Sequence, residues 1–179
     1  AGFAAFALDV AAAVVGADRT GEMPTPVMGA EDFSYVLDER PGALAFLGVL
    51  RPELKSECLL PLPDPERQQW SYLPGRRRGV SLKQMNEAER KAAHALLAAS
   101  LSARGDEKAE GVLELEGILG GIERFFGRDP QLYYVTLFGV PSEESPWAWR
   151  FEGHHLSLHF SSWSGALVSS TPAFFGANP

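Results

Sequence analysis

Residues 153–161 read GHHLSLHFS, and the order of side chains in this stretch points to an extended strand. From 156 to 160 every second residue is apolar, and the residues between them are polar. Side chains of a strand point alternately to its two faces, whereas those of a helix repeat every 3.6 residues. The period of two therefore predicts a strand, with His154 on its apolar face and His155 and His159 on its polar face.

The same period continues on both sides of this stretch. Three further runs read as strands: LYYVTLFG at 132–139, WAWRF at 147–151 and GALVSSTP at 165–172. Consecutive strands joined by short connections rich in turn residues are typical of antiparallel pairing. We expect a β-meander over this half of the chain.

Two helices are expected before the meander. Residues 86–105 begin with Asn86, and Glu89 follows three residues later, which is the spacing of a capping box. In the second helix, residues 107–126, apolar side chains form a stripe at helical spacing: Leu115, Ile118, Leu119, Ile122 and Phe126. The short connection between the helices predicts an antiparallel pair packed on the sheet, an α+β fold.

The beginning of the chain has a different character. An Ala- and Val-rich helix over residues 1–16 is interrupted by Asp9 and is too short to span a membrane. A short helix around 31–40 and an apolar strand over 43–50 follow. We interpret residues 1–50 as an α/β appendage.

Breaker residues and a change in composition suggest the domain boundaries. The appendage of residues 1–50 would be followed by a linker at 51–61 and by an α+β domain at 62–179. Within the proline- and glycine-rich stretch after residue 60, Arg76, Arg77 and Arg78 are consecutive. Such a run is typical of a solvated turn, and a phosphate-binding role is the alternative.

The charge and the cysteine content exclude several classes of function. The net charge of −7 argues against general binding to nucleic acid or to an anionic membrane surface. Cys58 is the only cysteine, so neither an internal disulfide nor a cysteine-based zinc site can form within the chain. A lone cysteine fits a reducing compartment, and we expect a cytoplasmic location. The sequence does not set the oligomeric state.

The three clustered histidines are the candidate metal ligands: His154, His155 and His159. On a regular strand, His154 and His155 point to opposite faces and cannot bind one ion together. His155 and His159 share a face, but four residues separate them by roughly 13 Å, too far for one zinc ion. We expect one of the three, preferably His155, to meet groups from another element. His155, Glu152 and Arg150 are the catalytic candidates.

Two stretches carry resemblances to known families. Residues 26–48, PVMGAEDFSYVLDERPGALAFLG, resemble the C-terminal part of the catalytic domain of aminoacylase-like zinc amidohydrolases. That resemblance implies two metals bound through ligands lying mostly upstream, and no histidine precedes His94 here. Glu31 and Asp32 match the motif but are not assigned as ligands.

Residues 62–179 resemble the bacterial family catalogued as domain of unknown function 3500. The resemblance is carried by four stretches: DPERQQWSYLPGRRRGVSL, LELEGILGGIE, YYVTLFGVPSEESPWAWRFEGHHLSLHF and STPAFFGANP. Members of that family continue beyond the last stretch with a further histidine-bearing segment, so the chain resembles a truncated member. The family implies no agreed activity.

Three functions remain in competition. The first is part of a metal-dependent enzyme, with a divalent ion such as zinc and a small-molecule ligand at the histidine strand. The second is a non-catalytic binding or scaffold module with an apolar face of tryptophans: Trp147, Trp149 and Trp163. The third is an amidohydrolase-related fragment that lacks its di-metal site.

Overall fold

The computed structural model describes residues 39–122, 128–164 and 166–176 of the chain. The chain divides into two compact units, Ala1–Glu31 and Asp32–Pro179, and every described residue belongs to the second. The linker expected at residues 51–61 lies inside this second unit. The helices expected over 1–16 and over most of 31–40 fall outside the described residues.

The described elements confirm the α+β class. The helices are α2 (Glu39–Val49), α3 (Pro52–Cys58), the 3-10 helix η4 (Pro65–Gln68), α4 (Glu87–Ala99) and α5 (Ala103–Ile122). The strands are β1 (Leu59–Leu60), β2 (Val80–Ser81), β3 (Tyr134–Phe138), β4 (Trp147–Gly153), β5 (Leu156–Trp163), β6 (Ala166–Ser169) and β7 (Ala173–Phe175). Among the helices described, none has the length and apolarity needed to cross a membrane.

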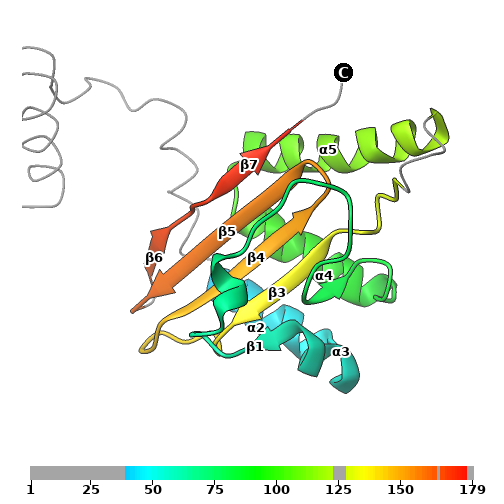
Figure 1. The fold of residues 1–179 in the computed structure, drawn as a ribbon. Helices are drawn as coiled ribbons and strands as arrows, with labels where there is room; N and C mark the ends of the chain where they lie inside the picture. Colours follow the sequence, from blue (N-terminus) through cyan, green and yellow to red (C-terminus); the bar gives the residue numbers. More distant parts are fainter. Residues whose placement is uncertain (1–38, 123–127, 165, 177–179) are drawn as a thin grey trace, which may run out of the picture. The chain divides into compact units, whose positions relative to one another are not determined.

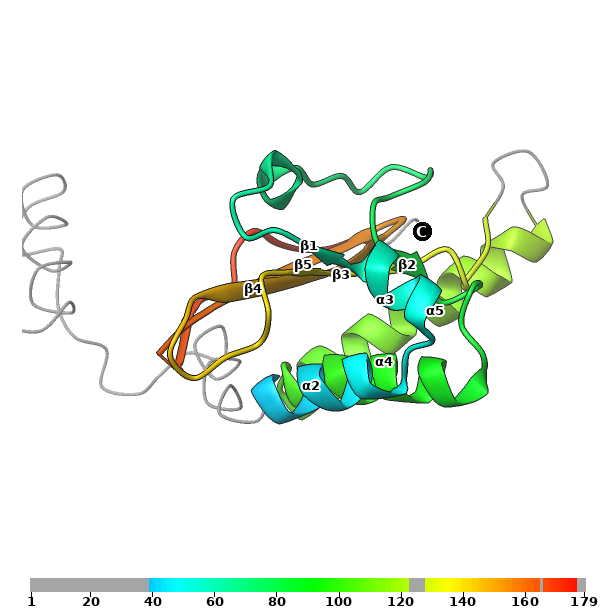
Figure 2. The ribbon, with the colours of Figure 1, turned by 90° about the horizontal axis from the view of Figure 1, so that it is seen from below.

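The strands form one mixed sheet built around the predicted meander. The order is β1-β3-β4-β5-β6, with β2 also on β3 and β7 also on β5 (Figure 1). All pairs are antiparallel except β1 with β3, which is parallel. Figure 2 shows three layers: α2, α4 and α5 lie on one side of the sheet, and residues 61–79 cross the other.

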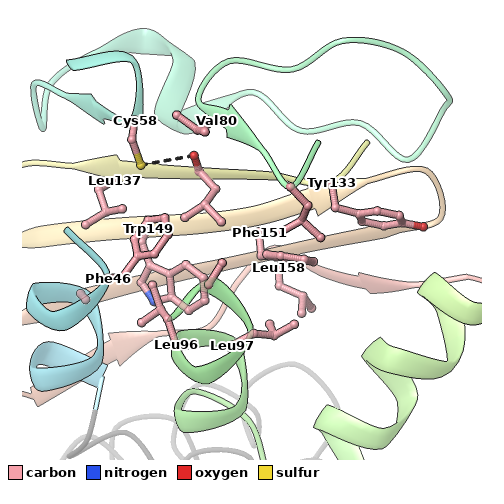
Figure 3. Close-up of a cluster of buried hydrophobic side chains, with 14 of the residues drawn as sticks. Phe46, Cys58, Val80, Leu96, Leu97, Tyr133, Leu137, Trp149, Phe151 and Leu158 are labelled. Atoms are coloured by element: carbon pink, nitrogen blue, oxygen red, sulfur yellow. Dashed lines mark hydrogen bonds between the residues drawn. The ribbon is translucent and has the colours of Figure 1, made fainter. Parts of the chain in front are cut away.

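The core lies between the helices and the sheet. Trp147, Trp149 and Phe151 alternate along β4 toward the helices, and each is at most 1% exposed. Figure 3 shows Trp149 between Phe46 of α2 and the leucines of α4. At the edge of this core the thiol of Cys58 donates a hydrogen bond to the carbonyl of Val135 over 3.4 Å. Burial raises the pKa of Cys58 to about 12, which keeps it an unreactive thiol.

The strand expected over residues 43–50 is wrong, because this segment is the helix α2. Its buried residues are Ala43, Phe46, Leu47 and Leu50. They are spaced by three, four and seven positions, which places them on one face of a helix. That face packs on α4, so residues 39–50 form part of the core of this unit.

Both predicted later helices are present, but they pack differently from the expectation. The capping box of Asn86 and Glu89 at the start of α4 is confirmed. However, α4 packs mainly on α2 and only touches α5. On α5 the apolar stripe expected from the sequence is not the buried face, since Leu115, Ile118 and Ile122 are exposed. The buried positions are instead Gly105, Ala109, Leu113 and Glu116.

Candidate functional site

The turn between β4 and β5 brings two of the predicted histidines together. Gly153 pairs with Leu156, so His154 and His155 form a two-residue hairpin turn. The expectation that they lie in the strand and point to opposite faces is wrong, although the strand itself is confirmed from Leu156 onward. His155 has a φ of 60°, and the two imidazole rings stack with centroids 3.9 Å apart.

The backbone of this turn is held from three other segments. A Cβ on Gly153 would lie 2.5 Å from the ring of Tyr133, so glycine is required there. The hydroxyl of Tyr133 then donates to the carbonyl of His154 over 2.8 Å. The amide of His155 donates to the carbonyl of Tyr72, and its carbonyl accepts from the amide of Gly176. The two imidazoles are therefore carried by a braced backbone.

A buried carboxylate from α5 meets the turn. Glu116 is 3% exposed, and both of its carboxylate oxygens lie 2.9 Å from Nδ1 of His154. Arg128 lies beside them, with Nη1 3.1 Å from Glu116 Oε2 and 3.4 Å from His154 Nδ1. The carboxylate thus has a cationic partner on one side and an imidazole on the other.

Glu116, His154 and His155 form the group of potential metal ligands found in the described part of the chain. One ligand atom from each lies within 4.8 Å of the other two. Burial lowers the pKa of His155, and the neighbouring His154 and Arg128 lower it further. At neutral pH His155 is accordingly a neutral imidazole, which is the form that binds metals.

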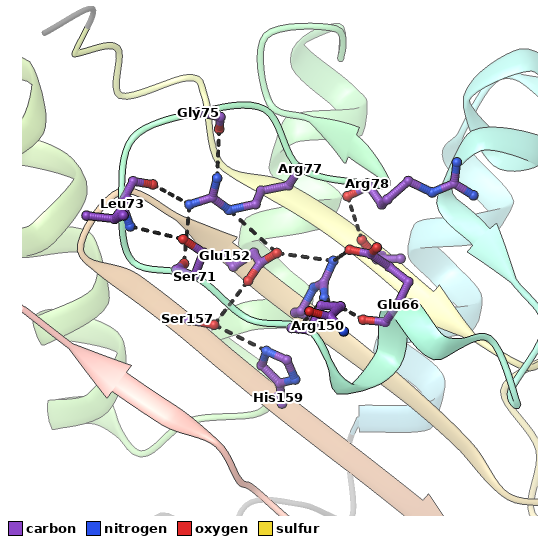
Figure 4. A network of polar contacts seen from close by, with 12 residues as sticks. Glu66, Ser71, Leu73, Gly75, Arg77, Arg78, Arg150, Glu152, Ser157 and His159 are labelled. Atoms are coloured by element: carbon purple, nitrogen blue, oxygen red, sulfur yellow. Dashed lines mark hydrogen bonds and ion pairs between the residues drawn. The ribbon is translucent and has the colours of Figure 1, made fainter.

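The other predicted residues lie elsewhere, on the face of the sheet that residues 61–79 cover. Arg150 is fully buried, and its guanidinium donates to the carbonyls of Glu66 and Gln69. Arg150 also forms ion pairs with the carboxylates of Glu66 at 2.9 Å and Glu152 at 3.1 Å (Figure 4). Burial raises the pKa of Glu152, although Arg150 and Arg77 act in the opposite direction. This network fastens the covering segment to the sheet.

His159 belongs to the same polar face. Ser157 donates to Glu152 over 3.1 Å, and its hydroxyl lies 3.2 Å from Nε2 of His159 (Figure 4). Burial, together with the charge of Arg150, lowers the pKa of His159 to about 4. The predicted residues are thus divided between two places, with His154 and His155 at the turn and Arg150, Glu152 and His159 on the sheet.

Sequence reasoning missed Glu116, which the structure places at the turn. The signal was present in the spacing, since Glu116 follows Ala109 and Leu113 at helical intervals of four and three. An acidic residue in line with small and apolar residues marks a buried charge that needs a partner. The exposed stripe of larger apolar residues on the same helix obscured it.

Fold and polar groups together define an α+β domain with two buried polar centres, one at a hairpin turn and one on a sheet face. The chain belongs to the family described as "Protein of unknown function (DUF3500)", whose model matches residues 40–179. The resemblance of residues 26–48 to amidohydrolases has no support, and residues 40–48 of that stretch fall within the family match. A search of curated proteins and a search of solved structures found no match to the chain.

Proposed function

We propose that this chain binds a divalent metal ion at Glu116, His154 and His155, and that the ion serves as the centre of a metal-dependent enzyme. The observation that carries the proposal is the approach of three ligand atoms to within 4.8 Å of one another. They come from a buried helical position and from a braced turn, which are far apart in the sequence. The reaction and the substrate lie outside the proposal.

The chemistry of the donor set supports zinc. Two imidazoles and one carboxylate are a set that catalytic zinc sites use, with further positions open to water or substrate. A zinc ion in such a set acts as a Lewis acid, the chemistry used in hydrolysis. The tyrosine bond to the carbonyl of His154 fixes the turn, in the manner of the outer partners that orient metal ligands.

Two adjustments accompany binding of a cation. The imidazoles of His154 and His155 stack with an interplanar angle of 29°, so His155 has to rotate for both rings to face one ion. Arg128 has to leave Nδ1 of His154, while it keeps its ion pair with one oxygen of Glu116. Both are side-chain movements, and neither disturbs the pairing of β4 with β5.

The test is a titration of chelator-treated protein with Zn²⁺ against a chromophoric competitor, repeated with Co²⁺ and its visible absorption spectrum. We expect one ion per chain and a four-coordinate cobalt spectrum. Glu116→Gln, His154→Ala and His155→Ala should each weaken binding by more than the roughly 100-fold that loss of an outer partner costs.

Two matched variants serve as controls. His94 is paired with Glu110 at 2.7 Å on the surface of α4, so it is a histidine–carboxylate pair outside the site. His94→Ala and His159→Ala should leave the zinc affinity unchanged. Absence of stoichiometric binding by the parent chain, or an equal loss in His159→Ala, would assign the cluster a purely structural role.

The two competing functions receive less support. Trp147 and Trp149 are each 1% exposed, so a recognition face built from them does not exist, and Trp163 alone is exposed. Hydrolysis of the aminoacylase type is not part of the proposal, because the resemblance that suggested it has no support.

A further inference from the structure

A cavity lies between residues 66–79 and the polar face of the sheet. It has a volume of about 750 Å³ and is lined by residues of α3, β1, β4 and the segment 66–79. That volume is within the range of small-molecule sites, about 300–1,000 Å³. None of the proposed metal ligands lines it.

The arginine run forms one wall of this cavity and is attached to β3 at its C-terminal end. Gly79 has a φ of +89°, and a Cβ there would lie 2.2 Å from Oγ1 of Thr136. The backbone therefore approaches β3 as closely as only glycine permits. Thr136 donates to the carbonyl of Arg78 over 2.9 Å and fixes the same point. The solvated turn expected from the composition holds for Arg76 and Arg78, which are exposed, but not for Arg77, whose side chain is 10% exposed.

Arg77 lies on the inner side of the wall. Its side chain is 10% exposed, and its guanidinium donates to the carbonyls of Ser71, Leu73 and Gly75 (Figure 4). Nε of Arg77 is buried and has no hydrogen-bond partner within the described ranges. Its nearest anion is Glu152, at 3.7 Å. The wall thus retains a buried donor that a ligand atom could satisfy.

Two more arginines and an indole line the same cavity, and all three are exposed. Arg76 is 84% exposed and only 3.8 Å from Glu57, a weak surface pair. Arg78 is exposed, and its guanidinium pairs with no side chain in the part of the chain that the structure describes. Trp70 lines the same cavity and is 46% exposed. Guanidinium groups bind carboxylate and phosphate in bidentate fashion, and an exposed indole offers a face for stacking.

We propose that this cavity binds a small organic anion, with a phosphate or carboxylate group held by Arg76 and Arg78 and a planar ring stacked on Trp70. A phosphate monoester is the preferred form, because its two negative charges match two guanidinium groups. The inference is independent of the proposed metal centre.

The test uses chelator-treated protein, so that no anion binds through a metal. Phenyl phosphate, benzoate, inorganic phosphate and phenol are titrated by calorimetry and by tryptophan fluorescence. We expect phenyl phosphate to bind best, benzoate more weakly, and phenol not at all. Inorganic phosphate should bind more weakly than phenyl phosphate, because it lacks the ring.

Surface variants separate the site from general charge effects. Arg76→Ala/Arg78→Ala should lower the affinity for phenyl phosphate at least about tenfold, the loss expected for charge-assisted hydrogen bonds. Trp70→Leu should lower it and abolish the fluorescence change. Arg104→Ala/Lys108→Ala removes the same charge from exposed positions on α5 and should change nothing. His155→Ala should keep phenyl phosphate binding while it loses zinc.

Three outcomes would overturn the inference. They are absence of binding by both phenyl phosphate and benzoate, equal affinities for phenyl phosphate and inorganic phosphate, and equal losses in the two double variants. Each is independent of whether zinc binds, so this site and the metal centre fail or succeed separately.

Discussion

The two faces of strand β4 are equally buried and chemically opposite. Every residue of β4 is buried, yet Trp147, Trp149 and Phe151 face the helices while Arg150 and Glu152 face residues 61–79. The apolar face is continuous with one large core cluster. The polar face holds an ion-pair network that extends to Ser157 and His159.

This difference distinguishes the apolar side chains that stabilise the fold from the polar groups that the fold holds in place. Apolar burial is favourable wherever a cavity is filled, whereas a buried charge is tolerated only when it is paired. Replacing a buried ion pair by apolar residues is often neutral or stabilising, so the polar face is weak evidence for stability. Glu152 of this network also lines the 750 Å³ cavity, where we propose that a small anion binds.

The contribution of the apolar face to stability is tested most directly at Trp149. Trp149→Ala should lower the free energy of unfolding by about 3–5 kcal/mol, because the side chain is fully buried and leaves a cavity. Urea unfolding followed by circular dichroism measures the loss. Trp163→Ala, at a position 58% exposed, should cost less than about 0.5 kcal/mol. Similar losses in both variants would mean that the helix-facing core is not the main source of stability.

On the polar face the corresponding change is Arg150→Met. We expect the free energy of unfolding to fall by about 3 kcal/mol, since the buried carboxylate of Glu152 is left with Arg77, at 3.7 Å, as its nearest cation. Adding Glu152→Gln should restore at least about 1 kcal/mol, because the second change removes the unpaired charge. No second substitution of this kind can rescue the cavity at Trp149. Additive losses in the double variant would contradict the charge-pairing explanation.

A smaller effect on stability is expected from the titration of His159, on the polar face. Its pKa is lowered from 6.5 to about 4 in the fold, so the unfolded chain binds the proton more tightly. Stability from this group is present above pH 6.5 and is lost as the pH falls toward 4. Between pH 7 and 5 the titration of His159 lowers the free energy of unfolding by about 2 kcal/mol.

The groups that face His159 are Ser157 on its own strand, Arg150 on β4, and Glu152 through Ser157. His159→Gln lacks the titration and should show a shallower fall in the free energy of unfolding over pH 7 to 5. The difference between the two chains isolates this histidine from the carboxylates, which titrate in both. Parallel pH profiles would show that His159 keeps an ordinary pKa.

The alternation of side chains was enough to predict the meander and the α+β class. It failed where a short apolar run fits either period: ALAFLGVL reads as a strand, but positions 43, 46, 47 and 50 are spaced for a helix. Runs of this length are ambiguous without tertiary contacts. The parallel strand β1 and the two-residue strand β2 are set by contacts with β3, which no local pattern encodes.

The candidate site was only partly predictable for a related reason. Extending the period of two backward from Leu156 placed His154 and His155 in the strand, whereas Gly153 ends β4 and the histidines form the turn. The glycine was the local signal of that change. The partnership of Glu116 and Arg128 with the turn depends on the packing of α5, and sequence spacing alone cannot supply it.

The covering segment leaves the sheet at β1 and returns at β2, and both of these two-residue strands pair with the same edge of β3. Between these strands the segment is held by the hydrogen bonds of Arg150 to the carbonyls of Glu66 and Gln69 and by that of the His155 amide to the carbonyl of Tyr72. We expect residues 61–79 to open as one local unit while the helices and β3–β5 stay folded, once these few contacts break. Hydrogen exchange of the backbone amides beneath the segment and exchange of a ligand bound in the cavity would then depend on the same opening equilibrium. Stronger pairing of β1 and β2 with β3 would slow both exchanges together.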